Sequence, residues 1–211
     1  MLRDPQANGT TADRAAHARP GSDAARLDHV LFVCTGNVCR SPYMEMVVTA
    51  ALAAGGTSTV RVGSAGTAAL EGHAMSAPIL AALKARGIDG SDFRARQLTA
   101  GMLQRSGIIV TAAREHRRWV TRLDPSAAAR TFTLFQVSRL IGAVDRDALA
   151  EADGLDHVVR LLNAARGAGG AGSSGDDIED PWQRSARIYR RVTRRIDTAI
   201  EPFAQALVGQ P

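Results

Sequence analysis

The sequence has few of the features that mark secreted or membrane proteins. Its 211 residues include only two cysteines, Cys34 and Cys39, which lie in one short segment. Secreted scaffolds spread their cysteines along the chain, so this pair argues against that class and favours a reducing compartment. No apolar stretch reaches the roughly 18 residues of a membrane span, and residues 1–28 lack the apolar segment of a signal peptide. We therefore expect a cytoplasmic protein that does not bind a membrane.

Lysine and aromatic residues are also scarce. Lys84 is the only lysine, so the net charge of +5 comes from arginine, and aromatic residues make up 4% of the chain. The core must therefore consist mainly of Leu, Ile, Val and Ala. Aromatic residues do not alternate with the basic ones, as base stacking on nucleic acids would require. We expect the arginines near the carboxyl end to form a solvated helix face, without a nucleic-acid partner.

The five histidines do not indicate a metal site. His73, His116 and His157 have no other ligand-type residues at metal-binding spacing. Each is expected to be a surface or capping residue. The histidines therefore predict no metal site.

The order of apolar segments predicts one α/β domain over residues 28–211, preceded by a disordered tail at 1–27. Four short apolar runs are typical of strands, and they lie at 29–33, 60–62, 107–110 and 131–134. Helical patterns follow them, which implies βαβ units with right-handed crossovers. The expected fold is a four-stranded, mostly parallel sheet flanked by helices on both faces in a single compact domain.

Boundary residues place the helices and loops. The predicted helices begin near Pro42, Pro78, Thr111 (as a cap), Phe135, Leu155 and Gln183. Residues 63–67 are small and predict a turn. Residues 166–176 are rich in glycine and serine and predict a mobile linker.

The segment from Cys34 to Ser41 carries the most specific chemical signal. An apolar strand leads directly into Cys34, Gly36 and Asn37 tolerate positive φ, and a helical pattern follows Arg40. Such a loop can turn backbone N–H groups inward and bind an anion at the positive end of the helix dipole. The same surroundings favour a thiolate, and an arginine can donate two hydrogen bonds to a tetrahedral oxyanion.

Residues 34–42, Cys-Thr-Gly-Asn-Val-Cys-Arg-Ser-Pro, resemble the phosphate-binding loop of the low-molecular-weight protein tyrosine phosphatases. The likeness continues in the family's order at 64–67, 94–98, 114–116 and 180–182. The resemblance implies hydrolysis of phosphate monoesters, with phosphotyrosine proteins or small aryl phosphates as substrates. It implies a cysteinyl-phosphate intermediate, no cofactor, and a monomer or weak dimer.

Hydrolysis of a phosphate monoester needs an anionic nucleophile, donors for the phosphate oxygens and an acid for the leaving group. By the resemblance, Cys34 attacks phosphorus, and Asp180 protonates the leaving oxygen and later activates water. Ser41 donates a hydrogen bond to the Cys34 sulfur. The phosphate oxygens are held by the Arg40 guanidinium and by the backbone N–H groups of Thr35, Gly36, Asn37, Val38, Cys39 and Arg40.

Supporting residues follow from the same resemblance. Asn37 holds the loop in a strained conformation through hydrogen bonds that include Ser64. Leu70 and Trp182 line the slot for the substrate ring. The family often has a histidine that helps to fix this asparagine, but Phe93 stands at that position here. Either the loop is held more loosely, or another donor replaces the histidine.

Three alternatives remain open. Asp180-Pro181 is also a common turn dipeptide, so Asp177 is the alternative acid. An arsenate reductase of the same fold normally needs more cysteines than this chain has. A phosphate-binding pseudoenzyme is disfavoured because nucleophile, arginine and acid are all present.

Cys39 lies close enough in sequence to form a reversible, protective disulfide with Cys34, which makes the nucleophile redox-sensitive.

Overall fold

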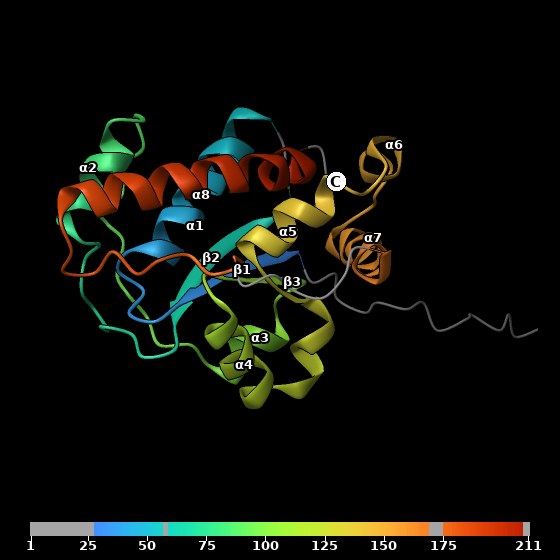
Figure 1. Ribbon diagram of the computed structural model, residues 1–211, viewed down its shortest axis with the longest axis horizontal. Coiled ribbons are helices and arrows are strands. Elements are labelled where there is room, and N and C mark those ends of the chain that lie inside the picture. Colours follow the sequence, from blue (N-terminus) through green and yellow to red (C-terminus); the bar gives the residue numbers. More distant parts are fainter. Residues whose placement is uncertain (1–27, 57–58, 169–174, 209–211) are drawn as a thin grey trace, which may run out of the picture.

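The computed structural model describes residues 28–56, 59–168 and 175–208 (Figure 1). Four strands form one sheet in the order β2-β1-β3-β4, and every neighbouring pair is parallel. The strands are β1 (His29–Cys34), β2 (Arg61–Gly66), β3 (Ile108–Thr111) and β4 (Thr131–Thr133). The predicted α/β sheet is confirmed, and it is wholly rather than mostly parallel. The predicted tail at 1–27 lies outside the described residues.

The two central strands are apolar over Val30–Val33 and Ile108–Val110, because helices cover the sheet on both sides. Alternate residues of β1 point to opposite faces: Val30 and Phe32 join one hydrophobic cluster, and Leu31 and Val33 join the other. All four side chains are at most 1% exposed. The sheet thus separates two layers of core.

Figure 1 shows α1, α5 and α8 on one side of the sheet and α3 and α4 on the other. The elements that pack into the larger cluster are α1 (Arg40–Ala54), α2 (Ala77–Lys84), α5 (Leu134–Ile141), α6 (Arg146–Ala150), α7 (Leu155–Ala168) and α8 (Ala186–Leu207). The smaller cluster lies beneath α3 (Ala100–Gln104), α4 (Arg114–Leu123) and the 3-10 helix η1 (Pro125–Arg130). The short α3, α6 and η1 were not predicted.

The long helix α8 is held to the sheet by an apolar stripe. Of the six residues that the helical spacing predicted, Val192, Ile196, Ile200, Phe203 and Leu207 are buried, whereas Ile188 is only partly buried. Tyr189, Ala199 and Ala204 are also buried and were not predicted. The Phe203 ring meets Phe32 of β1 edge-on, with centroids 6.4 Å apart. This aromatic pair connects the last helix to the central strand.

Three local predictions were wrong. Residues 63–66 continue β2 instead of turning, because they pair with β1 as far as Cys34. Gly66 suits this place, since a Cβ there would lie 2.4 Å from the Thr35 carbonyl oxygen. Thr111 does not cap a helix but ends β3, and its hydroxyl donates to the Phe132 carbonyl. The last helix begins at Ala186 rather than near Gln183.

The predicted linker at 166–176 is only partly described. Its first residues belong to α7, which continues to Ala168, and its centre at 169–174 lies outside the described residues. At its end, Asp176 is buried and pairs with Arg139 at 2.9 Å. The described ends of this segment are therefore structured, and the mobile linker stays a prediction.

The sheet order places a crevice at the end of β1. The chain leaves β1 for α1 on one face and leaves β3 for α4 on the other. In parallel sheets ligands bind outside the carboxyl ends of the strands at such a point. Ile178 also reaches this crevice, because its N–H donates to the carbonyl of Ala112, just beyond β3 (2.8 Å).

Truncation of Phe203 tests the packing of α8. We expect Phe203→Ala to lower the free energy of unfolding by about 3–5 kcal/mol, because it leaves a cavity against Phe32. Arg194→Gln, at an exposed position of the same helix, should change it by less than about 0.5 kcal/mol. Urea denaturation of both variants measures the difference, and equal effects would show that this pair does not anchor the helix.

Candidate active site

The loop after β1 presents its carbonyl groups to a neighbouring segment. The carbonyls of Cys34, Thr35, Gly36 and Val38 accept hydrogen bonds from N–H groups of residues 67–76, at 2.9–3.0 Å. The C=O of one residue and the N–H of the next point in opposite directions across a trans peptide. The N–H groups of the loop therefore point away from that segment. Among the described residues, none of the N–H groups of 35–40 donates a hydrogen bond to the protein.

Asn37 fixes the shape of this loop. Its φ of 54° is in the left-handed region, and its side chain is fully buried. The amide nitrogen donates to the hydroxyls of Ser41 (2.9 Å) and Ser64 (2.8 Å), and the amide oxygen accepts from the Arg96 N–H (2.9 Å). Every part of the amide is thus bonded, which offsets the cost of the left-handed backbone.

A second layer supports Asn37 from behind. The Ser64 hydroxyl donates to the carboxylate of Glu45 on α1, and burial raises the pKa of that carboxyl. Phe93 instead packs into the apolar core, with 8% of its surface exposed. The Phe93 side chain has no polar group to offer Asn37, whose amide oxygen accepts the backbone N–H of Arg96.

Cys34 and Ser41 meet within this loop. The Cys34 sulfur lies 3.0 Å from the Ser41 hydroxyl, which also receives the Asn37 amide. Since that hydroxyl accepts from Asn37, its own hydrogen is available for the sulfur. Ser41 can therefore donate a hydrogen bond to the Cys34 sulfur.

Arg40 is almost fully buried and reaches three partners. Its Nη1 donates to the Ile178 carbonyl (3.2 Å), and its Nη2 donates to the Thr35 hydroxyl (3.3 Å) and contacts Asp180 Oδ2 (2.5 Å). Its Nε is buried without a partner among the described residues. An unpaired buried N–H is costly, so this edge of the guanidinium is suited to bind an oxyanion.

The two candidate acids lie in different environments. Asp180 contacts Arg40, accepts the Trp182 N–H (3.1 Å) and leaves 47% of its side chain exposed. Asp177 instead forms a bidentate pair with Arg114, which lowers the pKa of the Asp177 carboxyl. Only Asp180 lines the cavity over Cys34.

That cavity has a volume of about 160 Å³. It is lined by Cys34, Thr35, Gly36, Val38, Cys39, Arg40, Ala68, Leu70, Asp180 and Trp182. All of these except Ala68 were named from the sequence. Asn37, Ser41 and Ser64 lie behind the loop and support it.

Cys39 is a free thiol, as is Cys34. Its sulfur lies 3.3 Å from the Ser76 hydroxyl and 3.7 Å from the Tyr189 hydroxyl, and burial raises the pKa of the thiol. A disulfide with Cys34 stays a prediction.

His116 is neither the surface residue nor the capping residue that we expected. It is 2% exposed, and its Nε2 lies 2.9 Å from the Thr35 hydroxyl in the loop. Burial, and then the charge of Arg40, lower its pKa to about 4. The imidazole is therefore neutral near pH 7 and adds no charge beside Arg40.

Comparison with known proteins matches residues 29–147, more than half of the chain, to the model of the low molecular weight phosphotyrosine protein phosphatases. The chain belongs to this family. The matched segment contains the Cys34 loop but not Asp180.

Two relatives of this phosphatase show how far the similarity extends. The probable low molecular weight protein-tyrosine-phosphatase EpsP of Ralstonia solanacearum is 32% identical over 110 residues, which are 52% of this chain and 72% of EpsP. The protein-arginine-phosphatase of Geobacillus stearothermophilus is 28% identical over 178 residues, which are 84% of this chain and 95% of the relative.

A solved structure supports the same conclusion. The low molecular weight protein tyrosine phosphatase from T. tengcongensis is 27% identical with a TM-score of 0.62, and the comparison covers 85% of this chain and 99% of that one. The shared region therefore extends over most of this phosphatase. Its family implies phosphoproteins or small phosphates as substrates.

No helix of the described residues is both long and apolar enough to cross a membrane. No cluster of three or more His, Cys, Asp or Glu side chains in those residues could hold a metal ion.

The stability of this phosphatase should depend on pH through His116. Its folded pKa of about 4 lies below its ordinary value of 6.5, so the unfolded state takes up the proton first as the pH falls. The contribution of His116 to the free energy of unfolding is therefore fully present above about pH 6.5. This contribution falls by roughly 2–3 kcal/mol as the pH approaches 4.

His116→Gln should remove this part of the pH dependence, because glutamine does not titrate. Urea denaturation between pH 4.5 and 7.5 measures the slope, with His73→Gln as the control at an exposed histidine. The interpretation is wrong if His116→Gln and His73→Gln show the same slope as the wild type.

Proposed function

We propose that this phosphatase hydrolyses phosphotyrosine on proteins, or small aryl phosphates, through a phosphate bound covalently to Cys34. One observation carries the proposal: a single small cavity is lined by the Cys34 sulfur, the Arg40 guanidinium and the Asp180 carboxyl. Nucleophile, anion-binding group and acid then face the same substrate, as in-line transfer of a phosphoryl group requires.

In the first step, the Cys34 thiolate attacks phosphorus. The S–P bond forms, the P–O bond to the tyrosine breaks, and Asp180 gives its proton to the leaving oxygen. The inward N–H groups of residues 35–40 and the free Nε edge of Arg40 hold the three equatorial oxygens. Because Asp180 contacts Arg40, the phosphate displaces the carboxyl from the guanidinium and leaves it beside the leaving oxygen.

In the second step, water attacks phosphorus in the intermediate. Asp180, now ionised, accepts a proton from this water, and the S–P bond breaks to release phosphate and the Cys34 thiolate. The Ser41 hydroxyl, 3.0 Å from the sulfur, stabilises the thiolate as it leaves. No step needs a metal or cofactor.

The slot supports an aromatic substrate. Val38, Leu70 and Trp182 supply apolar surface around its mouth, and Trp182 is 41% exposed. A tyrosine ring can bury its faces against these side chains, whereas an alkyl phosphate gains little from them. We propose Leu70 and Trp182 as the residues that hold the ring.

Phosphoarginine is the second candidate substrate, because a relative aligned over 84% of this chain is named a protein-arginine-phosphatase. A phosphorylated guanidinium carries N–H donors that need acceptors near the reacting phosphorus. Asp180 is the only carboxylate that lines the described slot, and it is assigned as the acid. The slot chemistry therefore favours the aromatic substrate.

The other two alternatives are weaker. A thiol cascade that reduces arsenate would have only Cys39 to resolve the Cys34 adduct. A pseudoenzyme would not need an acid over the nucleophile. We further propose that the protein acts in the cytoplasm as a monomer or weak dimer.

Three variants test the chemistry on p-nitrophenyl phosphate in the presence of EDTA. Cys34→Ser should abolish turnover, because the hydroxyl remains protonated. Asp180→Ala should lower kcat by about 10²–10⁴-fold and leave substrate binding intact, because only the acid is lost. Asp177→Ala is the matched control, and we expect kcat to change by less than about threefold.

Activity that survives in Cys34→Ser would rule out the covalent mechanism. A large fall in Asp177→Ala with little change in Asp180→Ala would transfer the acid role to Asp177. Loss of wild-type activity on addition of EDTA would contradict the metal-free mechanism.

Matched peptides test the substrate. We expect kcat/KM for a phosphotyrosine peptide to exceed that for the same peptide with phosphoarginine by at least about tenfold. Trp182→Ala should raise KM for the phosphotyrosine peptide by about 10-fold or more, which corresponds to the loss of one aromatic contact. A preference for phosphoarginine would establish the second candidate and leave the Cys34 chemistry intact.

A further inference from the structure

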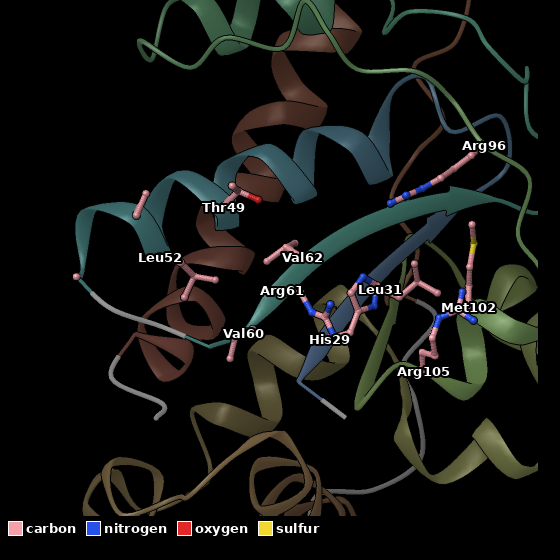
Figure 2. A pocket seen from close by; sticks show the side chains of 12 residues that line it. His29, Leu31, Thr49, Leu52, Val60, Arg61, Val62, Arg96, Met102 and Arg105 are labelled. Carbon is pink, nitrogen blue, oxygen red and sulfur yellow. The ribbon is translucent and has the colours of Figure 1, made fainter. Parts of the chain in front are cut away.

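A larger cavity of about 630 Å³ lies at the β2 edge of the sheet, away from the active site (Figure 2). We call it the edge pocket. Its polar lining comes from Thr49, His29, Arg61, Arg96 and Arg105. Its apolar lining includes Leu52, Val60, Val62 and Met102. No part of the catalytic mechanism uses it.

The three arginines bring uncompensated positive charge to the edge pocket. Among the described residues, no carboxylate forms an ion pair with Arg61, Arg96 or Arg105. The Nε–H of Arg96 donates to the Ser64 carbonyl (2.7 Å), and the two Nη groups remain available to an anion. Glu45 is the acidic group that Arg96 influences, but its carboxylate accepts from Ser64.

Gly63 has no side chain, so Arg96 and His29 can both approach the backbone at this position. A Cβ at this position would lie 2.6 Å from Arg96 Nη2 and 3.0 Å from His29 Nε2, so both nitrogens approach the backbone where a side chain would start. The other ring nitrogen of His29 lies 3.1 Å from the Ser106 hydroxyl, which orients the imidazole. Figure 2 shows Arg96 extending over β2.

The titration of His29 reflects the same charges. Burial lowers its pKa, and Arg96, Arg61 and Arg105 lower it further. All three guanidiniums therefore act on one ring, and an anion placed among them would raise the pKa again.

We propose that the edge pocket binds an organic polyphosphate of the nucleotide type. The phosphates lie against Arg61, Arg96 and Arg105, whose planar guanidiniums match phosphate oxygens. The base and sugar lie on the apolar side formed by Val60, Val62 and their neighbours. The volume falls within the range of small-molecule pockets, whereas the catalytic slot is several times smaller.

Arg96 connects the edge pocket to the catalytic loop. Its side chain lines the pocket, and its backbone N–H holds the Asn37 amide oxygen at 2.9 Å. A phosphate that draws the guanidinium toward the pocket acts on the residue that fixes the loop. Binding there should therefore change kcat, whereas a competitor at Cys34 changes only KM.

ATP is the probe, titrated calorimetrically into wild-type protein whose active site is saturated with orthovanadate. We expect one site, together with a shift of the His29 ring resonances in NMR spectra. Arg61→Gln/Arg105→Gln should weaken binding at least about tenfold. The control double variant Arg122→Gln/Arg146→Gln removes the same charge at exposed positions on α4 and α6. It should change the affinity for ATP by less than about twofold.

Several outcomes would overturn the proposal. ATP binding that disappears with orthovanadate would mean that ATP binds at the active site. Binding that both double variants weaken equally would mean that ATP is attracted by the overall positive charge of the protein. Inorganic triphosphate that binds as tightly as ATP would contradict the role of the apolar side. A constant kcat for p-nitrophenyl phosphate at saturating ATP would overturn the coupling through Arg96. None of these results depends on whether tyrosine is the substrate.

Discussion

The buried amide of Asn37 holds together the parts of the catalytic loop. A left-handed residue inside the protein is unfavourable unless its surroundings determine it, and here Ser41, Ser64 and the Arg96 backbone occupy all its bonding positions. The same bonds fix the Ser41 hydroxyl beside the Cys34 sulfur. The carbonyl groups of the loop accept hydrogen bonds from residues 67–76, so the N–H groups of the loop face the cavity. An anion site is thus built before any anion binds.

Asp180, the proposed acid, is brought to this loop by a different set of contacts. Ile178 donates to the Ala112 carbonyl just beyond β3, and its own carbonyl accepts from Arg40. The described segment 175–182 is therefore attached both to the sheet and to Arg40. This attachment places Asp180 over Cys34, while Asp177 turns to Arg114.

Particular residues show where sequence patterns succeed and where they fail. Gly63 to Gly66 were predicted as a turn because small residues favour turns, but pairing with β1 and the closeness of Thr35 make this segment a strand. His116 was predicted at the surface because it has no partner in sequence. Its partner is Thr35, and that contact exists only when α4 packs below the sheet. Glu45 and Arg96 were missed for the same reason, although Glu45 lies only a few residues beyond Ser41.

The sequence by itself determined the strand, loop and helix around Cys34 and the chemistry of that loop, because consecutive residues share one local geometry. It also predicted four strands and the stripe of α8, since hydrophobic periodicity reflects burial. Only the tertiary structure shows that Asp180 rather than Asp177 lines the cavity over Cys34, that the Arg96 backbone donates to Asn37, and that a second positive pocket shares Arg96 with the loop. Those contacts join residues 59, 81 and 140 positions apart, as in Asn37–Arg96, Thr35–His116 and Arg40–Asp180. Local patterns carry no information on such distances, because packing of whole helices and strands sets them.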